Sequence, residues 1–545
     1  MLTRRSGAAL RSRVSERTRA GVAVAAIVVL ISGQGFRYLL GLRLYAVLCV
    51  AVIAAVAVCF PLSRRILRVP PVLWAYVAFA ALGVTWSATR PVTALAVLVL
   101  VATTFLSVSI VGGLGPARFM EVLYRGLQVS VLGAVAFELF VTFVVGHAAL
   151  PLSSDLARLA PSGTSVSSVR WSEDMLLRGG PIQGFVGNRN PTAAIALFAA
   201  IAALVMLWEG RVRRLDAIAT LGTAVGVMLL TRSATVTAAA LYVGVLMVAA
   251  FAIRRAPAHL RRAASVAIVA GTAAAVVLTV RFRWFVFGLL GRSPEGTHRT
   301  SIWKAVIHAA EHRPQGWGFV GYWPVWEQPY SGILNKSGLF ATHAHNAFLD
   351  VWLQMGLCGL ILLVFLVAQL GASAWRLVEA STPRSSSLPL GWTLLAAALL
   401  TEALTESRML VEGGWFLLVA LLVSSTRPTE VASARQVSVR AAAAPTPAGK
   451  PLASVGGLRL ATPNPPPANE GWRDVSALDS LGDDTRWRAR SRRRGLVAQG
   501  EPSHATVHRS APANVAAAAG REATSAPVGG SAPLGANSAG AASHP

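Results

Sequence analysis

The sequence predicts an all-α polytopic membrane protein with about twelve transmembrane helices and a large extracytoplasmic loop between spans nine and ten. Only 14% of the 545 residues are charged and the mean hydropathy is +0.55, whereas a soluble protein of this length carries roughly 25% charged residues. Apolar runs of about 17 to 25 residues, long enough to cross a hydrocarbon core of about 30 Å as a helix, also recur along the chain. These observations exclude a soluble multidomain protein.

The apolar runs mark the expected spans one after another. They cover residues 20–34, 44–62, 72–88, 92–113, 126–148, 190–208, 215–231, 234–253, 264–287, 346–371, 389–406 and 413–425. The first run follows an arginine-rich head, as in a signal peptide, but no small-residue cleavage site follows it. It is therefore expected to be a retained helix.

The distribution of arginine predicts how the spans are oriented. Every second connector is basic, which is typical of short cytoplasmic loops. The chain is therefore expected in the cell membrane as a multi-pass protein, with both termini cytoplasmic and a functional site that faces outward. The expected parts are a basic cytoplasmic N-terminus (1–19), a transmembrane domain with the functional site (20–425) that includes the outward loops 149–187 and 288–344, and a disordered basic Ala/Pro/Ser/Gly-rich cytoplasmic tail (426–545).

The formal net charge of +26 would suggest a nucleic-acid partner in a soluble chain. In a membrane protein most of this charge belongs to the cytoplasmic connectors, and the arginine-rich run 486–494 is better explained by anionic lipid or solvent. Membrane lipids and no nucleic acid are therefore expected as partners. Cys49, Cys59 and Cys358 lie in apolar runs and offer neither a disulfide framework nor a CxxC metal site.

The densest group of polar residues lies where the loop 288–344 meets the tenth span. It contains His343, His345, Asn346 and Asp350. His345 is a candidate general base, because the dipole at a helix N-terminus favours the neutral imidazole. Further along the same span, Gly356 and Gly359 predict a smooth strip for close helix packing. The alternative interpretation is a polar interfacial cap above an ordinary packing helix.

Two expected outward positions hold arginine next to apolar spans. Arg232 lies in a short turn between spans seven and eight, where a cation opposes the charge bias and suggests an anionic ligand. A snorkelling arginine is the alternative. Arg299 precedes an amphipathic stretch, 302–310, that is expected to lie on the membrane surface. Taken alone, Arg299 would be a solvated loop charge.

Span six is expected to begin at Asn190 and Pro191, with Asn190 as the N-cap and Pro191 as the first helical residue. Arg189, beside this positive helix end, is also suited to binding phosphate. Both interpretations, a helix cap and a binding site, stay open.

One motif has the spacing of a zinc site. His308, Glu311 and His312 match the HxxEH pattern of inverted zincins. Pro314 ends the helix too soon after this motif to leave room for its scaffold, and no third ligand is identifiable. No metal site is therefore expected.

Taken together, the motifs resemble the O-antigen ligase and O-antigen polymerase superfamily of bacterial envelope enzymes, over about residues 20–425. The best signature is a histidine followed by asparagine, nine further residues and a GxxG motif. The matching motifs are His345-Asn346 with Gly356 and Gly359, Arg232 in Thr-Arg-Ser-Ala, Arg299 ahead of Ile302-Trp303, Pro314 followed by Gly316-Trp317-Gly318-Phe319, and Asn190-Pro191.

The resemblance implies a membrane glycosyltransferase that moves a glycan from undecaprenyl diphosphate to an acceptor hydroxyl at the outer face of the cytoplasmic membrane, in cell-surface polysaccharide biosynthesis. His345 would be the catalytic base for the acceptor hydroxyl. Arg232, Arg299 and Arg189 would bind the diphosphate, on which negative charge develops, so no metal ion or cofactor is expected. The supporting residues would be Asn346, His343, Asn190, Trp303, Asp350, Gly356 and Gly359. The partners would be the lipid-linked donor and a glycan, lipid or wall acceptor.

Several alternatives stay open at the level of sequence. The acidic residue that the family often carries in the tenth span is Gln354 here, which leaves Asp350 as the nearest carboxylate. A ligase and a polymerase are not separated. A polytopic transporter or flippase of lipid-linked glycans should show broken helices and midplane charges in two related halves. The sequence shows neither, since its polar residues cluster at the expected outward surface. A membrane scaffold would leave the spaced histidine, arginine and GxxG pattern unexplained.

Overall fold

A computed structural model describes residues 14–61, 69–153, 170–282, 299–337 and 341–426. The described residues form helices joined by turns, with no β-strand among them. One isolated antiparallel bridge joins Ala149 to Ser172. The all-helical class predicted from the sequence is thus confirmed for the part of the chain that the structure describes.

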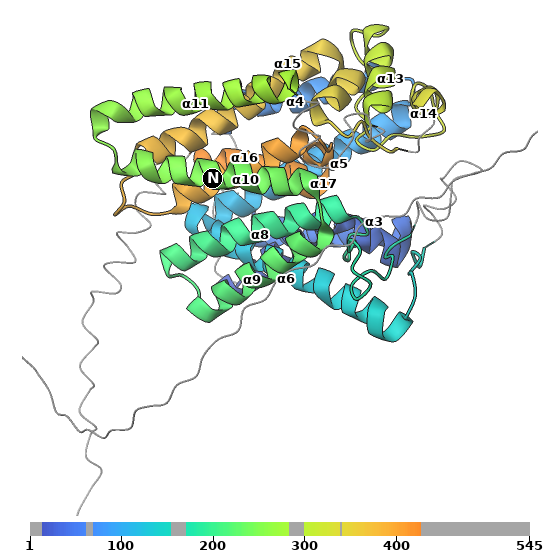
Figure 1. The fold of residues 1–545 in the computed structure, drawn as a ribbon. Helices are drawn as coiled ribbons and strands as arrows, with labels where there is room; N and C mark the ends of the chain where they lie inside the picture. The colour runs from blue at the N-terminus through green and yellow to red at the C-terminus, as the bar shows by residue number, and fades with distance from the viewer. Residues whose placement is uncertain (1–13, 62–68, 154–169, 283–298, 338–340, 427–545) are drawn as a thin grey trace, which may run out of the picture. The chain divides into compact units, whose positions relative to one another are not determined.

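The helices follow one another through the described segments (Figure 1). The longer ones are α2 (Glu16–Ile31), α3 (Gly33–Cys59), α4 (Pro71–Leu82), α5 (Arg90–Leu114), α6 (Pro116–Phe140), α8 (Arg189–Glu209), α9 (Arg214–Thr231), α10 (Ala234–Arg255), α11 (Ala258–Arg281), α13 (Arg299–Glu311), α14 (Tyr330–Ser337), α15 (Ala347–Glu379), α16 (Leu388–Ala403) and α17 (Glu412–Ser425). Short elements are η2 (Gly83–Thr85), a π-helical turn η3 (Val141–Val145) and η5 (Arg408–Leu410).

Seven of the described helices are long and apolar enough to cross a membrane, which makes the chain a multi-pass membrane protein. They are α3, α5, α6 with η3, α8, α9, α10 and α15, and three shorter apolar helices are α4 with η2, α16 and α17. Each of the twelve predicted spans overlaps a described helix. The number of helices that cross the membrane and the direction in which the termini point stay predictions.

The centre of the helical assembly is formed by α8, α16 and α17. α8 packs against α6, α9, α10 and α16, whereas α17 packs against α2, α5, α15 and α16. Glycines allow close approach: a Cβ on Gly391 of α16 would lie 2.8 Å from Val205 of α8, and one on Gly413 of α17 would lie 2.7 Å from the backbone of Ile31. Leucine and valine side chains on the outer helices, such as Val47 and Leu95, are exposed, as expected of a lipid-facing surface.

A second apolar core lies beside the start of α15, where α13 and α14 pack (Figure 1). The buried side of α13 comprises Ile302, Ala305, Val306 and Ala310. These residues cluster with Trp323, Tyr330 and Leu353. The prediction that 302–310 lies on the membrane surface is therefore wrong: the apolar face of α13 is covered by protein.

The predicted loop 149–187 is partly described, and its described part is anchored to α6. The buried carboxylate of Glu138 accepts hydrogen bonds from Ser172 Oγ at 2.9 Å and from the backbone N–H groups of Gln183 and Gly184 at 3.0 and 2.6 Å. This segment leads directly into α8. The predicted basic head up to residue 13, residues 154–169 of the first outward loop, residues 288–298 and 338–340 of the second, and the predicted tail beyond residue 426 lie outside the described residues.

Candidate functional site

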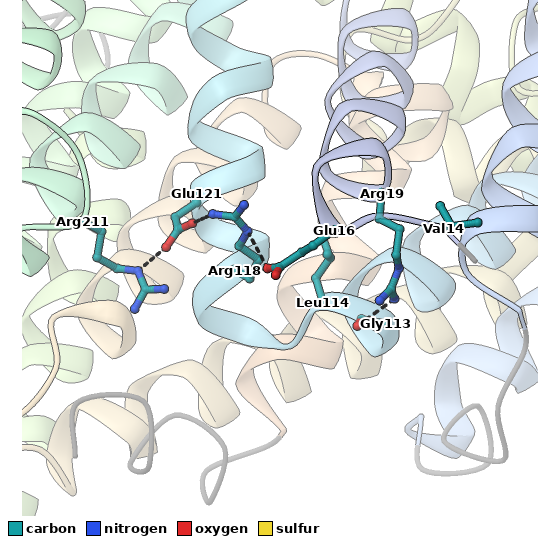
Figure 2. Close-up of a pocket in the computed structure, with 8 residues that line it drawn as sticks. All are labelled: Val14, Glu16, Arg19, Gly113, Leu114, Arg118, Glu121 and Arg211. Carbon is teal, nitrogen blue, oxygen red and sulfur yellow. Dashed lines mark hydrogen bonds and ion pairs between the residues drawn. The ribbon is translucent and has the colours of Figure 1, made fainter. Parts of the chain in front are cut away.

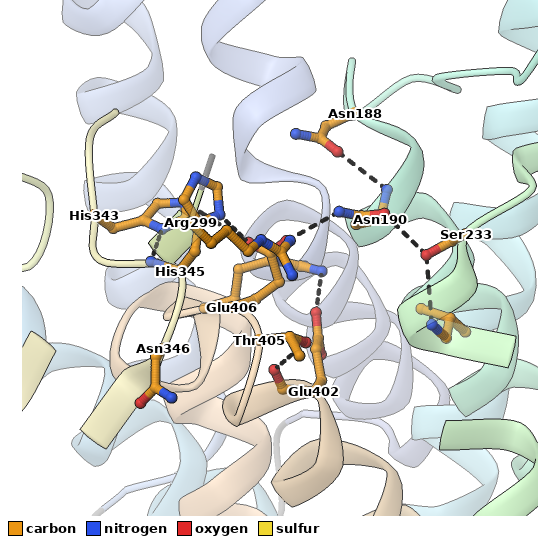
Figure 3. Close-up of polar contacts among 12 residues, drawn as sticks. Asn188, Asn190, Ser233, Arg299, His343, His345, Asn346, Glu402, Thr405 and Glu406 are labelled. Atoms are coloured by element: carbon orange, nitrogen blue, oxygen red, sulfur yellow. Dashed lines mark hydrogen bonds and ion pairs between the residues drawn. The ribbon is translucent and has the colours of Figure 1, made fainter. Parts of the chain in front are cut away.

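Four polar side chains from distant parts of the chain surround the carboxylate of Glu406 (Figure 3). Arg299 Nη2 and Asn190 Nδ2 donate to Oε1 at 2.7 and 3.0 Å. His345 Nδ1 lies 3.0 Å from Oε2, and His343 Nε2 lies 3.9 Å from the same oxygen. The Glu406 side chain is only 6% exposed. We call these five residues the Glu406 cluster.

Each member of the cluster lies at the end of a helix. Arg299 is the first residue of α13, and Asn190 lies in the first turn of α8. The two histidines precede α15, and Glu406 lies in the turn between α16 and η5. Helix ends are where polar side chains can meet without interrupting an apolar span. Residues more than 200 positions apart therefore converge at one end of the helices, as with Asn190 and Glu406.

The start of α8 differs from the prediction in a way that matters for the site. Asn188, not Asn190, is the N-cap: its Oδ1 accepts from the backbone N–H of Asn190 at 3.0 Å. Pro191 lies within the first turn, where its missing N–H costs nothing. The Asn190 side chain is thereby free to donate to Glu406 while its Oδ1 accepts from Ser233 Oγ at 2.9 Å.

The histidine segment before α15 has a defined conformation. His345 has a positive φ of 50°, and its backbone N–H donates to His343 Nδ1 at 3.1 Å. Trp303 Nε1 on α13 donates to the carbonyl of Ala344 at 2.9 Å. Asn346 caps α15, with Oδ1 accepting from the N–H groups of Phe348 and Leu349. Both histidine rings are thus held over Glu406.

These hydrogen bonds set the proton positions on the two imidazoles. Because His343 Nδ1 accepts a backbone hydrogen bond, the proton of the neutral ring is on Nε2, toward Glu406. His345 Nδ1 donates to the Glu406 carboxylate, so the lone pair of neutral His345 is on Nε2. A histidine with one nitrogen on a carboxylate and the other unprotonated is the arrangement of a general base.

The charges of the cluster lower the pKa of Glu406 against the effect of burial, whereas burial itself lowers the pKa of His343. Burial would raise the pKa of Glu406, but the hydrogen bond and charge of His345, with the charges of His343 and Arg299, lower it to about 2. For His343, burial and then the charge of His345 lower the pKa to about 3, against the attraction of Glu406. At neutral pH the cluster therefore holds an ionised Glu406 beside a neutral His343.

Among the described residues, His343, His345 and Glu406 form a group whose possible ligand atoms lie within 4.8 Å of one another. Its chemistry disfavours a metal ion. A cation on His343 Nε2 would force a proton onto Nδ1, which would then face the N–H of His345, and Arg299 already neutralises the carboxylate. In the HxxEH motif, Nδ1 of His312, which directly follows α13, contacts the backbone carbonyl of His308.

Asp350 and Glu406 are two buried carboxylates with different contacts near the histidine segment. Asp350 is fully buried, and it accepts from Trp323 Nε1 at 2.8 Å, from Gln354 Nε2 at 2.9 Å and from the N–H of Ala344 at 3.2 Å. Its role is to fix the segment that carries the histidines. Asp350 is thus the carboxylate beside Gln354, as the sequence indicated, whereas Glu406 is the carboxylate that contacts His345.

The GxxG motif also has a different role from the predicted helix strip. Gly356 has φ 63° and ψ −166° and interrupts α15, and a Cβ at this position would lie 1.9 Å from the carbonyl oxygen of Pro314. The segment after Pro314 enters the kink: Trp317 N–H donates to Leu353 O at 3.0 Å and Gly318 N–H to Gln354 O at 2.8 Å. The glycine thus admits a loop backbone, not a neighbouring helix.

The other two predicted diphosphate ligands lie outside the Glu406 cluster. Arg232 ends α9 in the left-handed conformation, with φ 48°, and its side chain is exposed. Its neighbour Ser233 bonds to Asn190, which brings the α9–α10 turn beside the cluster. Arg189 is exposed at the start of α8. Neither arginine side chain makes a hydrogen bond or ion pair that the described structure shows.

Sequence reasoning did not single out Glu406 or Ser233. The sequence did contain evidence for Glu406, because this carboxylate lies at the end of the predicted apolar span 389–406. A carboxylate in such a position is costly unless it has a partner, which predicts one. Ser233 carried no comparable signal, since serine is common at helix starts. In the structure Glu406 contacts Asn190, Arg299 and His345, and Ser233 contacts Asn190.

Part of the chain is similar to known proteins. Residues 217–364 match the family model described as O-antigen ligase. The exopolysaccharide production protein ExoQ of Rhizobium meliloti (strain 1021) is 33% identical over 114 residues, which cover 19% of this chain and 25% of that relative. The chain thus spans about a quarter of the length of this curated relative. The matched family region contains Arg232, Arg299 and His345. The predicted resemblance to the O-antigen ligase and O-antigen polymerase superfamily is confirmed, and it rests on residues 217–364 of the chain.

Proposed function

We propose that this protein is a metal-independent membrane glycosyltransferase that transfers a glycan from undecaprenyl diphosphate to an acceptor hydroxyl at the outer face of the cytoplasmic membrane. The observation that carries the proposal is the Glu406 cluster, in which a carboxylate orients His345 and pairs with Arg299. The family match supports glycan transfer as the type of reaction.

In the proposed reaction the acceptor oxygen attacks the anomeric carbon of the donor glycan. The bond between that carbon and the phosphate oxygen breaks, and its electron pair leaves with the lipid diphosphate. The proton of the acceptor hydroxyl moves to Nε2 of His345, and the imidazolium that forms is stabilised by Glu406 through Nδ1.

The proposed ligands of the diphosphate are Arg299, Arg232 and Arg189. Arginine is suited to this role because its planar guanidinium binds phosphate oxygens bidentately and keeps its charge. Arg299 uses Nη2 on Glu406, which leaves its other donors for a ligand. Arg232 and Arg189 are exposed. Three fixed positive charges would stabilise the leaving diphosphate without a divalent cation.

Polymerisation and ligation differ in the acceptor, which is another lipid-linked repeat in the first case and a different molecule in the second. The relative ExoQ is an exopolysaccharide production protein. We therefore favour polymerisation or attachment of an exopolysaccharide, capsular or wall glycan. Glycan length in a deletion strain separates the two: loss of a polymerase leaves single repeat units, and loss of a ligase leaves long lipid-linked polymer.

The decisive experiment is transfer in vitro with a defined undecaprenyl diphosphate oligosaccharide and purified protein. Transfer is expected to persist in chelator and to be abolished by His345→Ala, Arg232→Ala and Arg299→Ala, while membrane insertion stays normal. Wild-type turnover by His345→Ala, or strict dependence on added Mg²⁺, contradicts the mechanism. Movement of the intact lipid-linked glycan across vesicles without transfer would instead identify the rival class, a transporter or flippase.

A further inference from the structure

A polar pocket lies at the opposite end of α8 from the Glu406 cluster. α8 begins beside the cluster at Arg189 and ends at Glu209, and its 21 residues span about 30 Å, the thickness of a hydrocarbon core. Arg211 follows this far end and lines the pocket. The pocket and the candidate active site are therefore expected at opposite membrane surfaces.

The pocket is formed by the ends of α2, α5 and α6 and the turn after α8 (Figure 2). Its volume is about 390 Å³, more than ten times the ~30 Å³ that one water occupies in the liquid. The lining residues are Val14, Glu16, Arg19, Gly113, Leu114, Arg118, Glu121 and Arg211. Three guanidinium groups thus share one cavity that is large enough for a hydrated phosphate group.

Glu121 holds two of the arginines in place. Its carboxylate pairs with Arg118 through Oε2 and with Arg211 through Oε1, and Arg118 Nε also lies 3.7 Å from Glu16. Arg19 has no carboxylate partner among the described residues. It donates instead from Nε to Cys59 O at 3.2 Å and from Nη2 to Gly113 O at 3.1 Å. The pocket has three arginines and two glutamates, so its lining has a net positive charge.

Several guanidinium nitrogens have no hydrogen bond to a described residue. These are Nη1 of Arg19, Nη2 of Arg118 and both terminal nitrogens of Arg211. Arg118 Nε is buried, without a hydrogen-bond partner. Arginine donors that converge on one cavity are suited to a phosphate, which accepts several charge-assisted hydrogen bonds at once.

We propose that this pocket binds the phosphate of an anionic phospholipid in the leaflet opposite the active site. A lipid is favoured over a soluble anion because apolar side chains, Val14 and Leu114, line the same cavity, and Leu215, at the nearby start of α9, is 82% exposed. Acyl chains can follow such surfaces while the phosphate meets the arginines. The proposal does not depend on the proposed function.

The test is native mass spectrometry of the purified full chain with short-chain phosphatidylglycerol, phosphatidylcholine or soluble glycerol phosphate. Wild-type protein is expected to retain phosphatidylglycerol in preference to phosphatidylcholine, with little competition from glycerol phosphate. Arg211→Gln should weaken retention about fivefold, the factor expected for one basic residue beside an anionic lipid, and Arg211→Lys should largely restore it.

The matched control is Arg213→Gln, an exposed arginine of the same turn that does not line the pocket, and it should bind as wild type does. Equal retention by wild type and Arg211→Gln overturns the proposal, and full competition by glycerol phosphate overturns the lipid as the source of the phosphate. If Arg211→Gln unfolds in neutral detergent, Leu114→Asp provides a second test. This substitution adds a negative charge to the pocket and removes none of its hydrogen bonds, so it must weaken lipid retention.

Discussion

Glu406 is the residue on which the candidate site depends. Its two oxygens face different partners, Oε1 toward Arg299 and Asn190 and Oε2 toward the two histidines. A buried carboxylate of this kind is tolerated only when its charge is compensated and its lone pairs are used. Removing its charge therefore affects both halves of the proposed reaction, the orientation of the base and the position of the arginine.

Glu406→Gln is expected to lower the rate of glycan transfer about 10²–10⁴-fold, the range expected when a general base loses its orientation or the charge that stabilises its protonated form. Transfer from a lipid-linked donor measures the effect. Glu311→Gln is the matched control, since Glu311 is exposed on α13, and it should retain wild-type activity. An unaffected rate in Glu406→Gln would show that the cluster is not catalytic.

The same charges predict how stability depends on pH. The unfolded state takes up protons on His343 below pH 6.5 and on Glu406 below pH 4.5, whereas the folded state resists until about pH 3 and about pH 2. The unfolded state thus binds more protons in both windows, and stability falls as the pH is lowered. The contribution of these two groups to the apparent melting temperature should therefore decrease from pH 6.5 downward, and a comparison with a variant of the cluster isolates it.

His343→Asn separates the two contributions. The asparagine oxygen can still accept the His345 N–H, but it does not titrate, so the decrease between pH 6.5 and 4.5 should become smaller while the decrease below pH 4.5 remains. His308→Asn, which changes a histidine outside the cluster, should leave the wild-type pH dependence. Identical profiles for wild type and His343→Asn would rule out this assignment.

At the scale of the elements, two devices position the cluster. The turn that carries Glu406 is fixed by ion pairs on both sides, Arg408 with Glu402 and Arg37 with Glu412. The start of α15 is fixed by the interruption at Gly356, into which the segment after Pro314 packs. The ion pairs hold the turn that carries Glu406. The interruption at Gly356 frees the carbonyls of Leu353 and Gln354, which accept hydrogen bonds from the loop.

Gly356→Ala tests the second device. A Cβ would lie 1.9 Å from Pro314 O, and the backbone region is one that glycine alone adopts readily, at a cost of about 1–3 kcal/mol for other residues before any clash. The variant is expected to lose thermal stability and transfer activity together. Gly371→Ala in the same helix meets nothing within 4 Å and should be neutral or stabilise by up to about 1 kcal/mol. Equal stability of both variants would contradict the role of the interruption.

At the scale of the whole molecule, the described residues form two apolar cores with different surroundings. One joins the membrane helices around α8, α16 and α17, and the other joins α13, α14 and the start of α15. The Glu406 cluster draws on both, since Arg299 and the histidines come from the second and Asn190 and Glu406 from the first. The site is therefore complete only when the two cores dock.

Labelling with a membrane-impermeant thiol reagent tests the predicted orientation. Glu311→Cys, at the end of α13 away from Arg299, should react in intact cells because α13 belongs to the expected outward loop 288–344. Arg213→Cys, after the far end of α8, should react only after permeabilisation. The unsubstituted chain, whose three cysteines lie in apolar runs, provides the background. The reverse pattern would invert the topology and place the proposed reaction on the cytoplasmic side.

Much of the helical architecture follows from the sequence, because long apolar runs can satisfy their backbone in a membrane only as helices. Asn188 and Pro191 show the limit of this reasoning: any polar residue near the proline could cap α8, and only the structure selects Asn188. The face of α13 shows another limit, since an apolar stripe predicts burial but does not identify lipid or protein as the partner.

The membrane class follows from the sequence, and so do the candidates His345 and Arg232, since local spacing and the cost of charge beside an apolar run are properties of the chain. Arg299 became a candidate only through the family resemblance. The contacts of Glu406 with His345 and Asn190, and the loop packed against Gly356, are visible only in the folded structure. The contacts of Glu406 join residues far apart in the chain, and Gly356 leaves the helical conformation that its neighbours favour. No local sequence pattern specifies which distant helix ends will meet.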